Sequence, residues 1–152
     1  MKPGRRAAAS QRTPSAGSRR QGREAALQAL YLAELSRQSA ADLSPAVWSQ
    51  EPLADKTQRF ASHLIEGVSS SRPRIDPVLV KYAENWELSR MATVDRCILR
   101  LAAFELLSDL DTPVSVIINE AVEIARKYST AESSKFVNGI LDKVKLDRKS
   151  LF

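Results

Sequence analysis

Three arginines near the start of the chain are the residues best placed to do chemistry. Arg19, Arg20 and Arg23 fall in the first turns of a predicted helix, where free backbone N–H groups and the helix dipole already present positive charge. Each cation there is unfavourable by roughly a few tenths of a kcal/mol, which suggests that function keeps them. Backbone donors and guanidinium groups both bind anions, so the cluster predicts a phosphate-binding site. A solvated basic start that only aids solubility is the alternative.

The positive charge of the chain is concentrated around this cluster. The first 23 residues hold seven bases and no acid, whereas the full 152 residues have a net charge of +5. Concentrated basicity favours a polyanionic partner such as RNA, DNA or an anionic membrane surface. The sequence has no convincing helix-turn-helix, RNP or glycine-rich phosphate-loop pattern, and RNA is favoured over duplex DNA only weakly.

Patterns that would support catalysis or a metal centre are missing from the sequence. Cys97 is the only cysteine and His63 the only histidine, so an intrachain disulfide and the usual zinc sites are excluded. His63 has no evident catalytic partner, and no paired carboxylates stand out. No apolar run approaches the roughly 18 residues that a membrane span requires. We therefore expect a cytoplasmic protein that is not an enzyme and needs no cofactor or metal.

Residues 1–17 are expected to form a flexible basic arm. They contain no Leu, Ile, Val or aromatic residue, so they cannot bury enough apolar surface to offset the entropy of ordering. The same stretch resembles an organellar transit peptide in being rich in Arg and Ser and free of acids, and that alternative stays open.

Apolar residues at spacings of three and four predict helices along the rest of the chain. The first predicted helix covers about 19–37 and has Ser18 as its cap, a short second helix starts at Ser44 and Pro45, and a third follows Pro52 and ends in the cluster at 69–73. Four more helical segments are predicted, from Asp76 and Pro77 to Tyr82, from Met91 to beyond Phe104, from Thr112 to Tyr128, and from Phe136 to Val144. We expect an all-α bundle of six to seven helices, with the segment from Met91 at its centre. The Ser- and Pro-rich joint at 69–77 predicts two subdomains, about 18–72 and 73–147, within one domain over 18–152.

For several residues on these helices, the sequence pattern by itself favours a structural role over a functional one. Tyr31 and Phe136 lie on or beside apolar stripes, which favours core packing over base stacking. Asp95 and Arg100 lie on the more polar side of their helix, which favours a solvated face, with a protein interface as the alternative. Gly139 inside a helix costs about 1 kcal/mol relative to alanine, which predicts the close approach of another backbone.

Four blocks in order resemble the NusB family of bacterial transcription antitermination factors. The blocks are 19–31 (RRQGREAALQALY), 94–106 (VDRCILRLAAFEL), 118–125 (INEAVEIA) and 135–142 (KFVNGILD). Any one block alone is weak evidence, but the four in order are specific and together span about 18–146. The resemblance implies an all-helical fold of two small subdomains without catalytic activity.

The resemblance also implies partners. Members of the family bind the boxA element of nascent RNA together with NusE, a small-subunit ribosomal protein. The heterodimer joins a complex with other Nus factors on RNA polymerase, where it suppresses premature termination, chiefly in ribosomal RNA operons. A homodimer of the free protein remains an open alternative.

Two sets of residues match functional positions of the family. The resemblance implies RNA binding at the start of the first helix and around the start of the last one, by Arg19, Arg20, Arg23, Glu132, Lys135 and Phe136. It implies partner binding or antitermination for Tyr31, Asp95 and Arg100. With these assignments, we expect Tyr31 at an interface and not in the core, and Asp95 and Arg100 on a partner surface and not on a solvated face.

Two functions of other classes remain as alternatives. The RNA-binding domain of an rRNA cytosine methyltransferase shares this fold, but that function requires a nucleotide-binding domain that these 152 residues do not include. A helical scaffold for protein interactions would explain the bundle without any role in RNA binding.

Overall fold

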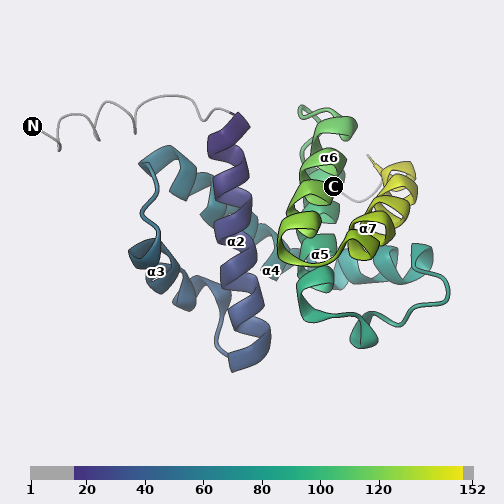
Figure 1. Ribbon diagram of the computed structural model, residues 1–152, viewed down its shortest axis with the longest axis horizontal. Helices are drawn as coiled ribbons and strands as arrows, with labels where there is room; N and C mark the ends of the chain where they lie inside the picture. Colours follow the sequence, from purple (N-terminus) through teal and green to yellow (C-terminus); the bar gives the residue numbers. More distant parts are fainter. Residues whose placement is uncertain (1–15, 149–152) are drawn as a thin grey trace, which may run out of the picture. The chain divides into compact units, whose positions relative to one another are not determined.

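The computed structural model describes residues 16–148, and within them it is all-helical (Figure 1). The helices are α2 (Ala16–Ser36), α3 (Ala40–Gln50), α4 (Asp55–Tyr82), η1 (Leu88–Arg90), α5 (Thr93–Ser108), α6 (Val114–Tyr128), α7 (Ala131–Val144) and η2 (Lys145–Asp147). This arrangement confirms the expected all-α class. None of the helices in the described range is long and apolar enough to cross a membrane. The chain divides into two compact units between Glu66 and Gly67, inside α4, whereas we expected subdomains to meet near residue 72.

The first helix begins earlier than predicted. α2 starts at Ala16, so Ser18 lies inside the helix and the last two residues of the expected arm are helical. Alanine is the best helix former, and the first helical N–H groups need no intrahelical partner, so the helix can extend past the predicted cap. The remainder of the expected arm, residues 1–15, lies outside the described residues.

The second helix also begins earlier, at Ala40. Ser39 is its N-cap and accepts a hydrogen bond from the backbone N–H of Asp42 at 3.0 Å. Pro45 therefore lies inside the helix, where it cannot donate to the carbonyl of Ala41. The Ser44 hydroxyl donates to that carbonyl instead, at 2.8 Å. Because this bond replaces the one that Pro45 cannot make, the helix tolerates the proline, and the predicted start at Ser44 is wrong.

The Ser- and Pro-rich stretch at 69–77 does not end a helix. α4 runs without interruption through Pro73 and Pro77, so the predicted stop and restart are wrong. Val68, Ile75 and Leu79 are almost fully buried at helical spacing on both sides of Pro73. Their burial outweighs the local cost of the prolines, which is roughly 3 kcal/mol for one inside a helix.

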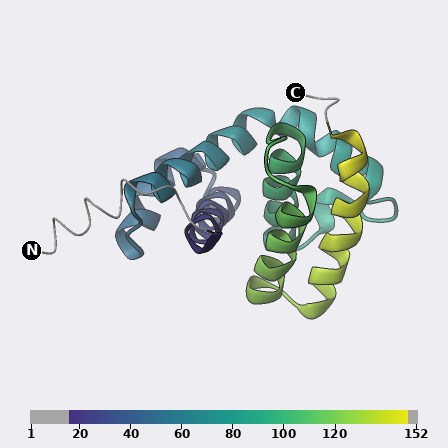
Figure 2. The ribbon, with the colours of Figure 1, turned by 90° about the horizontal axis from the view of Figure 1, so that it is seen from above.

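The second unit is built around α5, as expected. Residues along the whole length of α5 are buried, including Leu99, Ala103 and Leu106. α5 packs against α6 and α7, which also lie side by side in Figure 2. Within this unit, Gly67 of α4 faces the ring of Phe104, and a Cβ at Gly67 would overlap that ring. The close packing of α4 on α5 therefore requires glycine at this position.

Gly139 does not mark a close approach within the chain. It is exposed on α7, and a Cβ built there meets no described atom within 4 Å. The expected approach of another backbone is therefore wrong for the described part of the chain.

The segment that follows α7 is fixed by polar contacts to earlier parts of the chain. The Tyr82 hydroxyl donates to Asp147 Oδ1 at 2.7 Å, and Arg148 Nη2 donates to the carbonyls of Asp109 and Thr112 at 2.6 and 2.7 Å. A side-chain hydrogen bond with Tyr82 and the charge of Asp147 raise the pKa of Lys81 above its usual value.

Candidate nucleic-acid and partner interface

The arginine cluster of the first unit is arranged around one aromatic ring. The guanidinium carbons of Arg19 and Arg23 lie 4.6 and 5.4 Å from the centroid of the Phe60 ring on α4. Both distances allow cation–π attraction. A Cβ at Gly22 would lie 2.7 Å from Cδ2 of Phe60, so glycine allows the ring to lie this close to α2. Phe60 and Gly22 therefore position the cluster, which spacing along α2 alone did not indicate.

The three arginines differ in their access to solvent. Arg19 and Arg20 are half-buried, whereas Arg23 is only 4 % exposed. Since α2 begins at Ala16, Arg19 and Arg20 are its fourth and fifth residues, about one turn further from the free N–H groups than predicted. Phosphate binding at this cluster would therefore depend mainly on the guanidinium groups of Arg19 and Arg20.

An exposed apolar patch follows on the same helix. Tyr31, Leu32 and Leu35 are 37 %, 40 % and 60 % exposed, and we call these three residues the α2 patch. The interpretation of Tyr31 as a core residue is wrong, because its side chain is exposed while Leu27 and Leu30, earlier on the same helix, are buried. Its exposure leaves Tyr31 accessible to a protein partner.

Asp95 and Arg100 do not lie on a solvated face of α5. Asp95 is 8 % and Arg100 5 % exposed. Arg100 donates from Nε and Nη2 to the two carboxylate oxygens of Asp76, at 2.9 and 3.0 Å. Arg72 lies 3.8 Å from the same carboxylate. Arg100 therefore joins α5 to α4, and its guanidinium is directed at Asp76.

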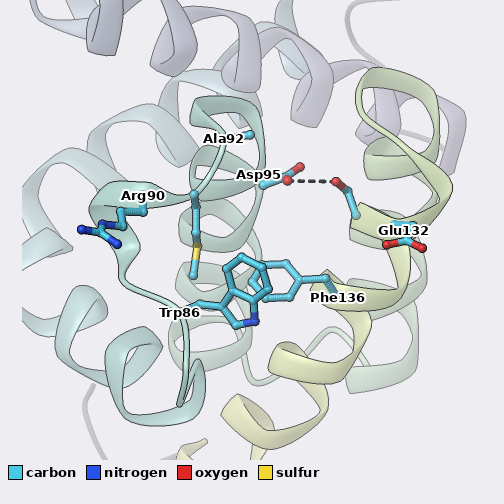
Figure 3. Close-up of a pocket in the computed structure, with 8 residues that line it drawn as sticks. Trp86, Arg90, Ala92, Asp95, Glu132 and Phe136 are labelled. Atoms are coloured by element: carbon cyan, nitrogen blue, oxygen red, sulfur yellow. Dashed lines mark hydrogen bonds between the residues drawn. The ribbon is translucent and has the colours of Figure 1, made fainter.

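A pocket of about 230 Å³ lies between the segment that precedes α5 and the start of α7 (Figure 3). It is lined by Trp86, Arg90, Met91, Ala92, Asp95, Glu132, Ser133 and Phe136. The rings of Trp86 and Phe136 meet edge to face, with centroids 5.4 Å apart. Trp86 is 58 % exposed, so this aromatic pair is open to a ligand.

The N-terminal turn of α7 fixes the polar side of the pocket. Thr130 caps the helix by accepting a hydrogen bond from the backbone N–H of Ser133 at 3.0 Å. The Ser133 hydroxyl donates to Asp95 Oδ2 at 2.9 Å, the bond drawn in Figure 3. The other oxygen, Asp95 Oδ1, is buried without a hydrogen-bond partner among the described residues.

The predicted site residues thus fall into separate groups. Asp95, Glu132 and Phe136 meet in the pocket, while Lys135 is exposed on α7 and does not line it. The arginine cluster and Tyr31 belong to the first unit. Sequence reasoning missed Trp86, whose position between the predicted helical segments that end at Tyr82 and begin at Met91, away from any apolar stripe, is the one indication of a functional role. No group of three metal-ligating side chains occurs among residues 16–148.

Comparisons with known proteins agree on one family. The model of the NusB family matches residues 20–145. The transcription antitermination protein NusB of Myxococcus xanthus is 45% identical over 132 residues, which cover 84% of this chain and 94% of that protein. The protein of the same name from Desulfitobacterium hafniense is 48% identical over 130 residues, which cover 84% and 87%.

Solved structures share the fold. T. maritima NusB has 37% sequence identity and a TM-score of 0.80, covering 86% of this chain and 92% of that one. A crystal structure of the antitermination factors NusB and NusE in complex with dsRNA has a TM-score of 0.78 at 24% identity, covering 85% and 96%. On the match of the family model and the identity of these relatives, the chain belongs to the NusB family.

Proposed function

We propose that this chain is a non-catalytic transcription antitermination factor. It binds boxA-type single-stranded RNA of nascent rRNA transcripts as a heterodimer with the ribosomal protein NusE, and joins other Nus factors on RNA polymerase in the cytoplasm. The observation that carries the proposal is the identity of 45% and 48% to transcription antitermination proteins over most of their length. The arginine cluster and the α2 patch supply the chemistry that such a role needs.

RNA binding begins at the arginine cluster in this proposal. Arg19 and Arg20 would contact phosphates, which provides affinity that depends little on sequence. Arg23 is buried and lies over Phe60 beside Arg19, so it would hold the ring in place. Single-stranded RNA suits such a site, because flexible phosphates can adapt to two neighbouring guanidinium groups.

A second RNA contact would lie on α7. Lys135 is exposed and carries the positive charge that a phosphate requires. Phe136 and Trp86 offer ring surface on which an unpaired base could stack. Glu132 is negatively charged and would repel a phosphate, so any contact with RNA would be to a base amino group.

The protein partner would bind two surfaces in the proposal. Tyr31 in the α2 patch offers an exposed ring and hydroxyl, the kind of residue that is enriched at interfaces. Asp95 would contribute through the pocket, while Arg100 would support that region through Asp76. In a solved structure with this fold, NusB is bound to NusE and dsRNA.

The test is binding of short RNAs to the full chain with and without purified NusE. We expect weak binding of the chain alone and at least about tenfold tighter binding of a boxA-like RNA when NusE is present. A scrambled RNA of the same composition should gain much less. Equal affinity for both RNAs in the presence of NusE would contradict the proposal, and a protein scaffold would bind partners equally well after ribonuclease treatment.

A further inference from the structure

Two further cations lie beside the arginine cluster, on the first turns of α4. Lys56 and Arg59 precede Phe60, the ring around which the cluster is arranged. α2 approaches these turns closely, because a Cβ at Gly22 would lie 2.7 Å from Cδ2 of Phe60 and 3.4 Å from the carbonyl oxygen of Thr57. Residues three or four positions apart on a helix are neighbours, with Cβ atoms roughly 5–6 Å apart. Lys56 is therefore a neighbour of both Phe60 and Arg59, at the place where α4 meets α2.

Neither cation is neutralised within the described part of the chain. Lys56 is half-buried and Arg59 is exposed, and their side chains form no ion pair or hydrogen bond with any of residues 16–148. Asp55 is the only acid on the first two turns of α4, so these turns carry an excess of positive charge. The arginines of α2 add to this excess, and the two helices together present one positive surface.

The fold itself gives no reason for the two charges on α4. Lys56 is the second residue of the helix and Arg59 the fifth, where the helix dipole already presents positive charge and a cation is mildly unfavourable. An exposed cation usually belongs to a solvated face, but Arg19 of α2 and Lys56 of α4 lie beside the same ring. Local preferences are most often broken in this way at binding sites.

We propose that the phosphate-binding surface of the first unit continues from α2 onto α4. Lys56 and Arg59 contact phosphates of the same RNA strand that Arg19 and Arg20 contact. A flexible single strand can adapt its phosphates to cations on two helices. The inference rests on the proposed function only in requiring that the chain binds RNA, and it needs neither NusE nor a preference for boxA.

The first experiment measures how RNA binding to the full-length chain depends on salt. A short unstructured RNA is titrated at several salt concentrations with the wild type, Lys56→Ala, Arg59→Ala and the double variant. Each lost phosphate contact should make the slope of log affinity against log salt concentration shallower by about 0.7, and the double variant by about 1.4.

Arg37→Ala is the matched control for these variants. Arg37 is exposed, and its side chain has no ion pair or hydrogen bond within residues 16–148. It follows α2 at the end opposite to the cluster, about 27 Å along the helix axis from Arg19. The substitution removes the same charge from the same unit, and we expect it to leave the slope unchanged. Circular dichroism checks that each variant is folded.

The second experiment locates the contact without any substitution. The lysines of the wild type are acetylated in a short pulse with and without saturating RNA, and mass spectrometry gives the rate at each lysine. We expect RNA to slow the reaction of Lys56 at least about threefold, because a lysine at the bound strand reacts only while the strand is released. Lys81, which is 60 % exposed on the second unit, should react at the same rate in both samples.

The outcomes separate this proposal from the proposed function. If the wild type binds RNA but the folded double variant keeps its slope, the α4 contact is overturned and the proposed function stands. If the slope changes as expected but boxA-like and scrambled RNA bind equally well in the presence of NusE, the proposed function fails and the α4 contact stands. Should the double variant not fold, the acetylation rate of Lys56 decides, and an unchanged rate with RNA overturns the proposal.

Discussion

Arg100 and Asp76 form a bidentate ion pair that joins α5 to α4. The Arg100 side chain is 6 % exposed, whereas Asp76 is 27 % exposed and also lies near Arg72. Asp76 lies between Pro73 and Pro77 on α4, where the sequence suggests a break in the helix. It therefore helps to hold α4 continuous along the second unit.

Replacing Arg100 with methionine should lower the free energy of unfolding by roughly 2–3 kcal/mol. The value is below that of fully buried pairs because Asp76 remains partly hydrated after it loses its main partner. Urea unfolding measures the change, with Arg72→Met as the exposed control, for which we expect less than about 0.5 kcal/mol. The double variant Asp76→Asn/Arg100→Met should recover part of the loss, since it leaves no unpaired charge. A loss below about 1 kcal/mol for Arg100→Met would contradict a stabilising role for the pair.

Gly67→Ala should destabilise the second unit. The added methyl would overlap the Phe104 ring, and relief of such overpacking typically costs about 1–3 kcal/mol. Phe104 is 5 % exposed, so the ring has little free space into which to move. Thermal unfolding followed by circular dichroism measures the effect, and an unchanged midpoint would show that α4 and α5 can separate slightly at no cost.

Gly139→Ala should have the opposite effect. Glycine inside a helix is about 1 kcal/mol less favourable than alanine, and a Cβ at this position meets no described atom within 4 Å. We therefore expect the variant to be up to about 1 kcal/mol more stable than the wild type. The same unfolding assay checks this, and a loss of stability would show that a neighbour approaches Gly139 in solution.

The salt dependence of RNA binding tests the arginine cluster. Each phosphate contact with single-stranded RNA contributes about −0.7 to the slope of log affinity against log salt concentration. Replacing Arg19 and Arg20 together with alanine should therefore make the slope shallower by about 1.4. Arg126→Ala, at a surface ion pair with Glu123 on α6, is the control and should leave the slope as it is. An unchanged slope in the double variant would show that the phosphate contacts lie elsewhere on the protein.

Phe60→Leu tests whether the ring positions the cluster. The substitution removes the cation–π contacts of Arg19 and Arg23 while keeping an apolar side chain against Gly22. We expect a loss of stability of about 1 kcal/mol and a several-fold lower RNA affinity, with the salt slope retained because no charge is removed. RNA affinity equal to that of the wild type would show that the arginines need no aromatic support.

Local periodicity was enough to predict most of the helices. The stripes of α5, α6 and α7 lie within single segments, and a repeat of three and four residues specifies which face is buried whatever the neighbouring helices are. The arginine cluster could be predicted for the same reason, since its residues lie within five positions of one another. The composition, with one cysteine and one histidine, likewise argued against the usual zinc sites.

Only the tertiary structure decided the features that depend on contacts between distant segments. The continuity of α4 results from burial of Ile75 and Leu79, which outweighs the turn preference of the prolines. The charges of Asp95 and Arg100 suggested solvent exposure, but both residues are buried, where Ser133 donates to one oxygen of Asp95 and Asp76 pairs with Arg100. The pocket combines side chains from two distant segments, residues 86–95 and 132–136, and no local pattern encodes such an encounter because it arises from the packing of whole helices.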